Sequence, residues 1–525
     1  MVAATGCSPV HPHAHIEGGF AGVSLERGHF LRDTLQASRA LNAPAKVINT
    51  HVLVLGGGVA GLAATRALRL RGVEDFALLE MEDESGGNAR GGVTQGLAHP
   101  LGAHYLPLPG DAAHEVQDLL EEMGLRTRVA GRWHYDERHL CHSPQERLYF
   151  QGQWQEGVLP VAGVEASTLE QYRTFARLVD RLRSAGDWSI PLSNKPPAQQ
   201  IRALAAITFV AYLDQNGLTD THLRWYLDYC CRDDFGAGID AVSAWAGVHY
   251  FASRHGFHAP GADNAEREGL LTWPQGNAYL TRYLAQPLGE RQHTGRTVLR
   301  VVQTRSGVEV DAYDNASHTV ERWRARRAIV ALPIHVAARV VQDAPAFLRD
   351  AAQQIRYAPW LVANLHISAP LHDRPGAPPS WDNVVHGAQG LGYVDAMHQS
   401  LHSGPGPTVL TYYRAMGLDP LARRALQETP WSVWRDGILA ELGVAHPDLA
   451  AKTTRLDITR YGHAMAVPVP NVLGQIGLQP NQRLRHQLSK TERVALSHGN
   501  LRFAHSDWAG YSVFEEAFTM GHISA

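Results

Sequence analysis

Lysine is scarce in this chain, because only Lys46, Lys195, Lys452 and Lys490 occur among its 525 residues. The 48 basic residues are therefore almost all arginine, and 51 acidic residues bring the formal net charge to -3. Binding to nucleic acid phosphates requires a clustered basic excess, so this balance excludes a nucleic-acid-binding footprint. The scarcity also leaves few lysines available as catalytic groups.

Cysteine and long apolar runs are also lacking. The four cysteines are Cys7, Cys141, Cys230 and Cys231, and this spacing predicts neither a disulfide framework nor a zinc site. No run of about 18 apolar residues occurs, so no transmembrane helix is expected. The length of the chain favours two domains.

The N-terminal residues, 1 to about 45, are rich in Gly, His and Ala and are expected to form an irregular arm. Ala4-Thr-Gly-Cys7 is similar to the end of a bacterial lipoprotein signal, but no charged region or apolar run precedes it. A periplasmic or membrane-anchored lipoprotein and a flexible cytoplasmic tail both remain open. His11, His13 and His15 alternate, and a solvated linker is favoured over a metal site because no carboxylate or cysteine completes one.

A strand–turn–helix–strand unit is predicted next. The apolar run His51–Leu55 is typical of a buried parallel strand, a helix follows from Leu62 to Arg71, and Phe76–Glu80 is a second strand. Between strand and helix lies Gly56-Gly-Gly-Val-Ala-Gly61.

These glycines form the pattern G-x-G-x-x-G. Gly56 allows a tight turn, Gly58 lets a pyrophosphate approach the backbone, and Gly61 permits close packing of helix on strand. The phosphates would lie at the helix N-terminus, where unpaired N–H groups and the dipole favour negative charge. Glu80 is placed to accept hydrogen bonds from ribose hydroxyls. The sequence therefore predicts dinucleotide binding.

A second glycine segment, Gly86-Gly87-Asn88-Ala-Arg90-Gly-Gly92, follows Glu80 after five intervening residues. This arrangement resembles the flavin-containing amine oxidase superfamily, in which an acid, five residues and Gly-Gly-Arg succeed one another. The resemblance implies FAD, with Gly86 and Gly87 near its pyrophosphate. Asn88 stands where the family usually has arginine, and we hypothesise that Arg90 supplies the phosphate contact instead.

Three further segments resemble the family. Gly102-Ala-His104-Tyr105 is similar to the loop that passes close to the isoalloxazine, and Trp273-Pro-Gln-Gly-Asn277 to the segment before a helix. The resemblance implies that Val298, at the start of the next strand, holds the adenine side through its backbone. Arg327-Ala-Ile-Val-Ala-Leu-Pro333 is similar to the strand and proline that return the chain to the flavin domain.

The tail carries a further part of the resemblance. Phe503-Ala-His-Ser-Asp507 is similar to the family's Phe-Ala-Gly-Thr-Glu, which implies that Asp507 serves the ribityl chain, although His505 replaces a glycine. Ser512-Val513-Phe-Glu515 has the spacing of a capping box and predicts a helix from Glu515 to Gly521. Its N-terminus, at Ser512 and Val513, would face the flavin pyrimidine, where the dipole stabilises negative charge. An ordinary capped terminal helix would show the same spacing. No cysteine lies in the tail, so FAD is expected to be held without a covalent bond.

The predicted fold class is α/β: an FAD-binding Rossmann-like domain with a discontinuous α+β substrate domain. The arm spans 1–45, the FAD-binding domain 46–110, 266–340 and 485–525, and the substrate domain 111–265 and 341–484. The predicted helices and strands are Glu115–Met123, Leu169–Ala185, Thr297–Val302, Gly307–Ala312, Arg327–Leu332 and Trp360–Ile367, with an exposed break at Ser193–Pro197.

The resemblance implies oxidation of the C–N bond of an amine by hydride transfer to flavin. Many members of the family place a lysine near flavin N5 on the strand that corresponds to Trp360–Ile367, and here that strand has none. The electron acceptor therefore remains open between dioxygen and another oxidant, and the enzyme class between an oxidase and a dehydrogenase. Polyamines are the substrate class to test first. The alternatives are a flavin desaturase or isomerase of an apolar polyene and a non-catalytic flavoprotein scaffold.

Candidate residues for the substrate are less well defined. Asp228, Asp233, Asp234 and Asp240 lie around Cys230 and Cys231 and could hold a cationic amine, with Trp225, Tyr226 and Trp245 as aromatic faces. Solvated acids at a helix end and core aromatics are the alternative interpretation. His249, His255 and His258 are interpreted as loop and core residues rather than metal ligands. His463, Trp508 and Tyr511 are predicted to lie near the flavin as catalytic candidates, with plain packing as the alternative.

Overall fold

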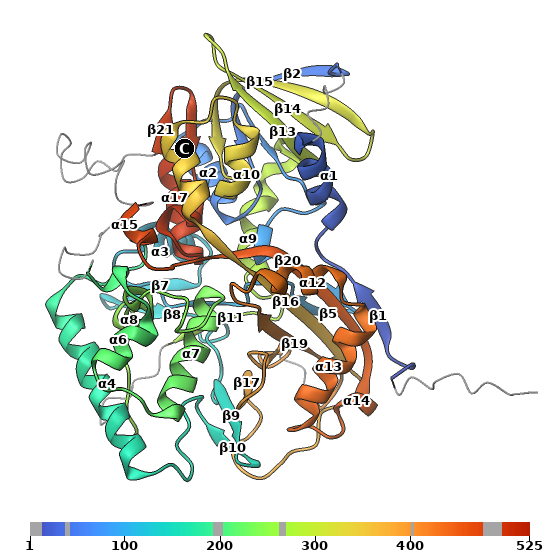
Figure 1. The fold of residues 1–525 in the computed structure, drawn as a ribbon. Helices are drawn as coiled ribbons and strands as arrows, with labels where there is room; N and C mark the ends of the chain where they lie inside the picture. Colours follow the sequence, from blue (N-terminus) through green and yellow to red (C-terminus); the bar gives the residue numbers. More distant parts are fainter. Residues whose placement is uncertain (1–12, 37–42, 193–202, 262–268, 401–403, 476–495) are drawn as a thin grey trace, which may run out of the picture.

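The computed structural model describes residues 13–36, 43–192, 203–261, 269–400, 404–475 and 496–525. Cys7, His11 and the break at Ser193–Pro197 lie outside the described residues. The described strands form two eight-stranded sheets and several hairpins. In Figure 1 the first sheet lies at the top of the molecule and the second lies below it.

The first sheet is built around β2 (Lys46–Leu55), which pairs in parallel with β3 (Phe76–Leu79) and β15 (Thr319–Val330). The last residues of β15 also pair in parallel with β22 (Leu501–Phe503), so the tail closes the sheet that the first strand opens. Parallel strands covered on both faces are almost continuously apolar, as Val52–Leu55 is. The remaining strands are β12 (Gln292–His293), β13 (Arg296–Gln303), β14 (Val308–Asp314) and β21 (Leu496–His498).

Helices cover both faces of the first sheet. On one face α2 (Val59–Leu70) packs directly against α17 (Phe514–Ser524), and they share an apolar core with α3 and α9. The core of the other face includes residues of α10 and α11. The bounds are α3 (His114–Glu122), α9 (Ala278–Ala285), η3 (Gln286–Arg291), α10 (Ile334–Val340) and α11 (Ala346–Gln354). Although α3 and α11 lie in ranges assigned above to the substrate domain, their apolar side chains belong to the cores of the first sheet.

The second sheet has the strand order β1-β20-β16-β19-β18-β17-β9-β10. Its two longest strands, β16 (Arg356–Ile367) and β20 (Thr453–Val467), pair with each other and run towards the first sheet in Figure 1. The other strands are β1 (Glu17–Phe20), β9 (Glu146–Phe150), β10 (Gln153–Glu156), β17 (Asp382–Val385), β18 (Tyr393–Asp395) and β19 (Thr408–Ala415).

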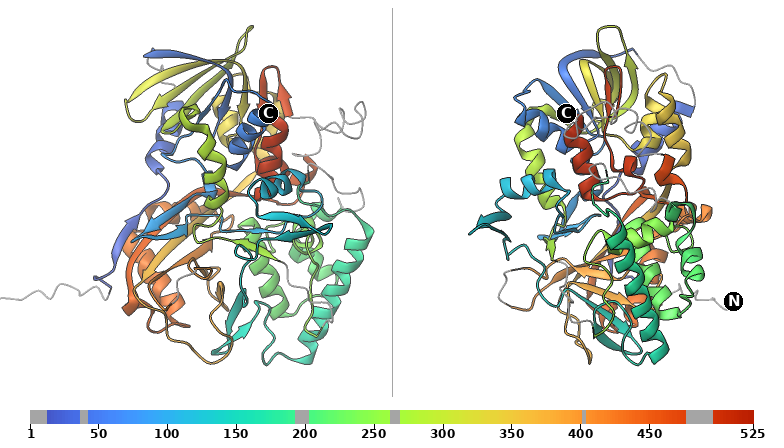
Figure 2. Two further views of the ribbon diagram at one scale, coloured as in Figure 1. Left: turned by 180° about the vertical axis from the view of Figure 1, so that it is seen from behind. Right: turned by 90° about the vertical axis from the view of Figure 1, so that its left-hand side faces the viewer.

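The two faces of the second sheet carry separate cores. One face packs against α4, α6, α7 and α8, and the other against α13 and α14. Figure 1 shows these groups on opposite flanks, green and orange, and the view from behind in Figure 2 shows the same separation. The bounds are α4 (Ala166–Ala185), α6 (Phe209–Gln215), α7 (Thr221–Phe235), α8 (Ala244–Ala252), α12 (Pro420–Glu428), α13 (Trp431–Gly443) and α14 (Leu449–Lys452).

Short elements join these layers. Three two-stranded sheets pair β4 with β5, β6 with β11, and β7 with β8. The bounds are β4 (Gly91–Thr94), β5 (Leu97–Pro100), β6 (Tyr105–Pro107), β7 (Arg126–Val129), β8 (Arg132–Tyr135), β11 (Leu270–Thr272), η1 (Gly87–Ala89), η2 (Ala203–Ala206), α15 (Val472–Gln475) and η4 (Ser506–Ala509).

The strand–turn–helix–strand unit over 51–80 is confirmed, and so are the other predicted helices and strands, within a few residues of the expected ends except at β15, which begins earlier. The described part of the N-terminal arm is not irregular, because it contains β1 and α1 (Leu25–Gln36). β1 pairs in parallel with β20, and Arg27 pairs with Asp83 in the loop after β3. Both partners are distant in sequence, so no local pattern indicated the pairing. No helix within the described residues has the length and apolarity to cross a membrane.

The α2–α17 contact gives a prediction about stability. A Cβ atom at Gly521 of α17 would lie 2.0 Å from the carbonyl oxygen of Ala60, which is backbone and has little room to move. We expect Gly521→Ala to destabilise the protein by about 1–3 kcal/mol, measured as the urea unfolding midpoint followed by circular dichroism.

The matched control is Gly437→Ala in α13, where the added Cβ would have no neighbour within 4 Å. There the change should stabilise the helix by about 0.5–1 kcal/mol, because alanine has the higher helix propensity. Equal effects of the two substitutions would contradict the tight contact between α2 and α17.

Candidate functional site

Two glycine turns lie against each other at the end of β2. A Cβ at Gly61 would lie 1.8 Å from the carbonyl oxygen of Gly56, so only glycine fits there. Gly58 forms a bridge with Gly86, and the Gly86 N–H donates to the carbonyl oxygen of Gly57 at 2.7 Å. Gly87 has φ +57°, and a Cβ on it would lie 3.1 Å from Cα of Gly58. The predicted residues Gly56, Gly58, Gly61, Gly86 and Gly87 are therefore brought together.

The N-terminus of α2 opens onto these turns. Its N-cap residue, Gly58, has no side chain to cap the helix, and the first turn contains no acidic residue. The leading N–H groups and the helix dipole are thus available to an anion. The buried hydroxyl of Ser85 has no hydrogen-bond partner among the described residues, and it lies 2.5 Å from where a Cβ of Gly57 would be.

Glu80 ends β3 beside the first turn. Its carboxylate accepts hydrogen bonds from the N–H groups of Gly57, at 2.7 Å, and Glu82, at 2.8 Å. Burial raises the pKa of Glu80 despite these donors. Each carboxylate oxygen retains a further lone pair, which a ribose hydroxyl could use.

The second turn leads to Asn88 and Arg90. Asn88 is exposed and donates its amide to the carbonyl oxygen of Ala464 in β20, at 2.8 Å. Arg90 is buried; its Nε donates to the carbonyl oxygen of Gly87 at 3.2 Å, and its guanidinium lies 3.8 Å from the Glu82 carboxylate. Arg90 therefore lies next to the glycine turns, and its contact with a phosphate remains a prediction.

Val298 lies in β13, near the end of β3. The N–H of Arg296 donates to the carbonyl oxygen of Glu80 at 2.7 Å, which fixes the start of β13 beside Glu80. Val298 is buried, and the pairing of β13 with β14 shifts register after it. Its predicted role in holding adenine remains a prediction.

Asp507 is fully buried in the tail and joins three segments. Its Oδ2 accepts from the Tyr357 hydroxyl at 2.6 Å and from the Ile334 N–H at 3.0 Å, and His505 lies 3.1 Å from Oδ1. Burial alone would raise the pKa of Asp507, but His505, Tyr357 and the Ile334 N–H outweigh it and hold the pKa at about 2. Asp507 thus clamps the start of α10, which follows β15, and the start of β16 to the tail.

His463 lies beside this clamp. Its ring stacks on His335 with 4.5 Å between centroids, and Tyr357 packs edge-on at 5.8 Å. Desolvation, with Arg423 and Arg339 nearby, lowers the pKa of His463 to about 4, and burial lowers that of His335 to about 3. Both imidazoles are therefore neutral near pH 7 and cannot act there as cationic acids.

The start of α17 differs from the capping-box prediction, which is wrong. The N-cap residue is Val513, without a side-chain cap, and the Ser512 hydroxyl accepts from the Ala466 N–H of β20 instead. The first turn contains Glu515 and Glu516, both buried. Glu516 accepts from Tyr511 and from the Leu192 N–H, and burial raises its pKa to about 7.

Trp508 and Tyr511 lie in packed cores. Trp508 is 4% exposed and packs against Phe347 and Phe503, whereas Tyr511 is fully buried and packs against Trp245 and His249. Both rings are buried in packed cores, and neither contacts the His335–His463 pair. This arrangement favours plain packing, the alternative interpretation, for both residues.

An aromatic cluster forms where the loop after β5 meets the second sheet. The His104 ring stacks on Tyr413 of β19 at 4.2 Å between centroids, and Trp381 lies 5.5 Å from His104 and 5.9 Å from Tyr105. We call these four residues the aromatic cluster. Burial lowers the pKa of His104 to about 3, so its ring is neutral. The loop is fixed to the second glycine turn, since the Ala103 N–H donates to the carbonyl oxygen of Asn88.

Two carboxyl groups adjoin the aromatic cluster. Tyr105 donates to Asp233 at 3.5 Å, and Tyr229 donates to Asp382, which follows Trp381, at 3.4 Å. Neither acid forms an ion pair with a basic side chain within the described residues. Burial and the Asp234 carboxylate raise the pKa of Asp233 to about 7, although Arg254 lowers it. Burial and the carboxylates of Glu146 and Asp233 raise the pKa of Asp382 well above its usual range. We call Asp233 and Asp382 the acid pair; such groups favour a bound cation.

The other predicted acids are not brought into this site. Asp228 pairs with Arg232 at 2.9 Å and Asp234 with Arg254 at 3.0 Å, while Asp240 is exposed. Of the predicted aromatic faces, Trp245 and Tyr226 pack in the core, and Trp225 lies on His386 at 4.3 Å.

The histidines considered above as alternatives for metal binding lie apart from one another in role and exposure. His249 is buried against Trp245, and His255 and His258 are exposed. His15 contacts the carbonyl oxygen of Ala450. Among the described residues no group of three or more potential ligands comes together.

Three residues of the site were missed by the sequence analysis: Tyr357, Asp382 and Tyr413. Asp382 lies in the segment Trp381-Asp-Asn-Val384, where an acid directly after a tryptophan is the only local signal. Tyr357 and Tyr413 reach the site through strand pairing, which no local pattern specifies.

The glycine turns fit a dinucleotide. A pyrophosphate would find a cradle of backbone N–H groups at the uncapped start of α2, where the two turns meet without side chains. The Ser85 hydroxyl, which has no partner among the described residues, adds a further polar group. The N-terminus of α17 fits the predicted pyrimidine contact less well, because Glu515 and Glu516 already offer negative groups to its dipole.

The sequence matches one protein-family model, described as flavin containing amine oxidoreductase, over residues 59–525. No curated protein matches it significantly. Among solved structures, putrescine oxidase bound to putrescine has 18% sequence identity and a TM-score of 0.65, covering 91% of this chain and 98% of that one.

Two other solved structures are similar. Cyclohexylamine oxidase from Brevibacterium oxydans IH-35A has 16% identity and a TM-score of 0.63, covering 90% of this chain and 97% of that one. A fatty acid isomerase from P. acnes that produces CLA has 14% identity and a TM-score of 0.59, with the same coverage. At these identities the likeness concerns the fold, and it confirms the predicted fold class.

The cradle predicts different outcomes for two glycines. A Cβ at Gly58 would have only Cα of Gly87 within 4 Å, at 3.9 Å, so Gly58→Ala should leave the protein folded while its methyl group obstructs the pyrophosphate. We expect it to weaken flavin binding by about tenfold, or 1.4 kcal/mol, measured by titrating the stripped protein with FAD.

Gly61→Ala is the matched comparison, because its Cβ collides with the backbone at Gly56. It should lower the melting temperature as well as the flavin content. Full flavin affinity in Gly58→Ala would contradict the placement of the pyrophosphate against this turn.

Proposed function

Because this chain belongs to the flavin-containing amine oxidoreductase family, we propose that it binds FAD non-covalently and oxidises the C–N bond of an organic amine, with polyamine-like substrates as the class to test first. The observation that carries the proposal is the acid pair, Asp233 and Asp382, beside the aromatic cluster. Bound flavin supplies the hydride acceptor.

The cradle residues would hold the cofactor. Gly56, Gly58 and the start of α2 would receive the pyrophosphate, and Glu80 the adenosine ribose. Non-covalent binding is supported by the cysteines, because Cys141, Cys230 and Cys231 are buried in the core of the second sheet. Burial raises the pKa of the Cys141 thiol to about 12, so it stays protonated and unreactive.

The acid pair would bind and orient the substrate. A carbon gives up a hydride readily only when the lone pair on its attached nitrogen is free, so the reacting amine must be neutral. A diamine or polyamine keeps a second, distant ammonium group for the carboxylates to hold. Tyr105, Trp381 and Tyr413 offer ring faces that stabilise the same cation by about 0.5–2 kcal/mol each.

No described lysine is available near the aromatic cluster. Lys46 pairs with Glu321 and Lys452 with Asp448, while Lys195 and Lys490 lie outside the described residues. The electron acceptor, dioxygen or another oxidant, therefore has to be identified by experiment.

The apolar alternative, a polyene isomerase or desaturase, is supported by the likeness of the fold to that of the fatty acid isomerase. The acid pair argues against it, because an apolar chain lying there would leave two half-buried carboxyl groups without compensation. A non-catalytic scaffold would bind flavin and give no reaction.

The first experiment is reduction of the flavin-loaded protein without oxygen, followed by its visible spectrum. We expect diamines and polyamines to bleach the flavin and polyenes to leave it oxidised. Asp233→Asn and Asp382→Asn should each raise KM for a diamine by about 10- to 100-fold, through the loss of a charge-assisted contact. The exposed Asp240→Asn is the control and should not change KM.

Bleaching by polyenes alone would favour the isomerase or desaturase, and no bleaching by any compound would favour the scaffold. Either result would refute the proposed amine oxidation.

The acid pair also predicts a pH dependence. Since the pKa of Asp233 is about 7, the group is mostly protonated at pH 6 and mostly ionised at pH 8. Binding of a bis-quaternary ammonium inhibitor, whose charge does not titrate, should therefore strengthen about tenfold as the pH rises from 6 to 8.

Asp233→Asn should flatten this rise, measured as the inhibitor dissociation constant at each pH. Affinity that falls with rising pH, or that keeps its rise in the variant, would refute the role of Asp233.

A further inference from the structure

A cavity of about 730 Å³ lies on one face of the second sheet, and the aromatic cluster lies on the opposite face. Side chains alternate along a strand, so Leu148 and Val384 face the core next to α7, whereas Tyr149 and Val385 face the core next to α13. Tyr393, a cavity-lining residue, belongs to this second core. The sheet therefore separates the cavity from the acid pair.

One end of the cavity contains a buried guanidinium group. Arg147 of β9 is 4% exposed, its Nε donates to Oδ1 of Asn383 at 2.6 Å, and its NH1 to the carbonyl oxygen of Ala377 at 3.3 Å. Its guanidinium lies 4.0 Å from the centre of the Trp154 ring. In the part of the chain that the structure describes, no carboxylate pairs with it. A buried charge without a counterion is costly, so this end of the cavity attracts an anion.

Two further basic groups gather at the same end. His446 is 2% exposed; its Nε2 hydrogen-bonds the Tyr393 hydroxyl at 2.8 Å, while its buried Nδ1 has no partner among the described residues. Burial lowers the pKa of His446 to about 4, and Arg147 and Arg374 both contribute, so both guanidinium groups lie near this ring. Arg374 in turn donates to the Tyr149 hydroxyl at 2.5 Å.

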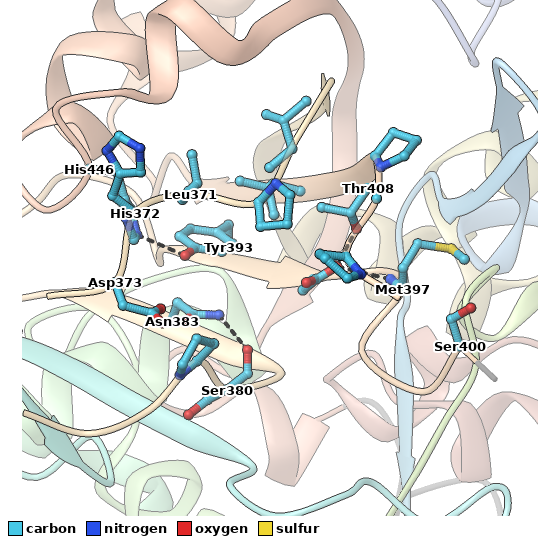
Figure 3. A pocket seen from close by; sticks show the side chains of 18 of the residues that line it. Leu371, His372, Asp373, Ser380, Asn383, Tyr393, Met397, Ser400, Thr408 and His446 are labelled. Carbon is cyan, nitrogen blue, oxygen red and sulfur yellow. Dashed lines mark hydrogen bonds between the residues drawn. The ribbon is translucent and has the colours of Figure 1, made fainter. Parts of the chain in front are cut away.

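The rest of the cavity is of mixed character. Figure 3 shows His446, Tyr393 and Asn383 along one side and Thr408 and Met397 across from them. Leu371, Ile367 and Leu410 supply apolar surface. Two acids line the cavity, Asp373 and Asp395. Asp373 is exposed, and the carboxylate of Asp395 accepts from the Thr408 hydroxyl and the Met397 N–H rather than from the arginines.

We propose that this cavity is a second ligand site that binds a small organic monocarboxylate. Its carboxylate group would lie against Arg147, Arg374 and the unpartnered Nδ1 of His446, and its hydrocarbon part along Leu371 and Leu410. The guanidinium fork matches a planar carboxylate. The apolar wall favours an amphipathic acid over inorganic phosphate, which would leave that wall unfilled.

The experiment measures binding to the full chain by calorimetry and by thermal shift. The probes are acetate, butyrate, hexanoate and benzoate, with hexanamide as the uncharged match of hexanoate and inorganic phosphate as the second anion. We expect hexanoate to bind more tightly than acetate, and hexanamide and phosphate to bind at least tenfold more weakly than hexanoate.

Arg147→Met should weaken hexanoate binding by tenfold or more, and the exposed Arg138→Met should not change it. Because Arg147 is buried and its replacement also disturbs the core, Arg374→Met and Tyr393→Phe provide milder changes, each expected to weaken binding about threefold to tenfold. Gly58→Ala, which disturbs only the flavin cradle, should bind hexanoate like the original chain.

No carboxylate binding, phosphate binding as tight as hexanoate, or hexanoate binding unchanged in the arginine variants would overturn the proposal. Loss of hexanoate binding in Gly58→Ala would overturn it too, because the acid would then occupy the flavin cradle. These outcomes are independent of amine oxidation.

Discussion

The close contact between the two glycine turns is the constraint on which the rest of the site depends. Gly58 and Gly87 approach so closely that a Cβ on Gly87 would lie 3.1 Å from Cα of Gly58. A side chain on Gly87 would therefore push the second turn away from α2. The same turn then holds the aromatic cluster in place, because the carbonyl oxygen of Asn88 accepts from Ala103. The glycine turns and the aromatic cluster are thus positioned by one piece of backbone.

Two acids in this protein have very different pKa values because they have different donors. Asp507 accepts from a hydroxyl and a backbone N–H and lies beside His505, so its pKa is about 2 despite complete burial. Asp233 has one distant phenol, 3.5 Å away, and its pKa is about 7. The first needs nothing further and serves as a structural clamp. A cation beside the second would stabilise its ionised form.

Sequence patterns predicted the elements whose signal is local. The apolar run at 51–55 and the spacing of Gly56, Gly58 and Gly61 gave the strand, turn and helix correctly. The capping box at Ser512 failed because the Ala466 N–H, from a distant strand, takes the serine hydroxyl. β1 and Tyr413 were missed for the same reason: pairing between strands that are distant in sequence leaves no local trace.

The ladder between β9 and β17 explains how opposite charges coexist in one thin sheet. Glu146 stands beside Asp382, and the next pair, Arg147 and Asn383, points to the other face. Like charges therefore gather on one side, while the arginine on the opposite side is out of reach of these carboxylates. Neither side can neutralise the other through the backbone. The proposed cation and the proposed anion would therefore lie on opposite faces of one sheet, the first beside Asp382 and the second beside Arg147.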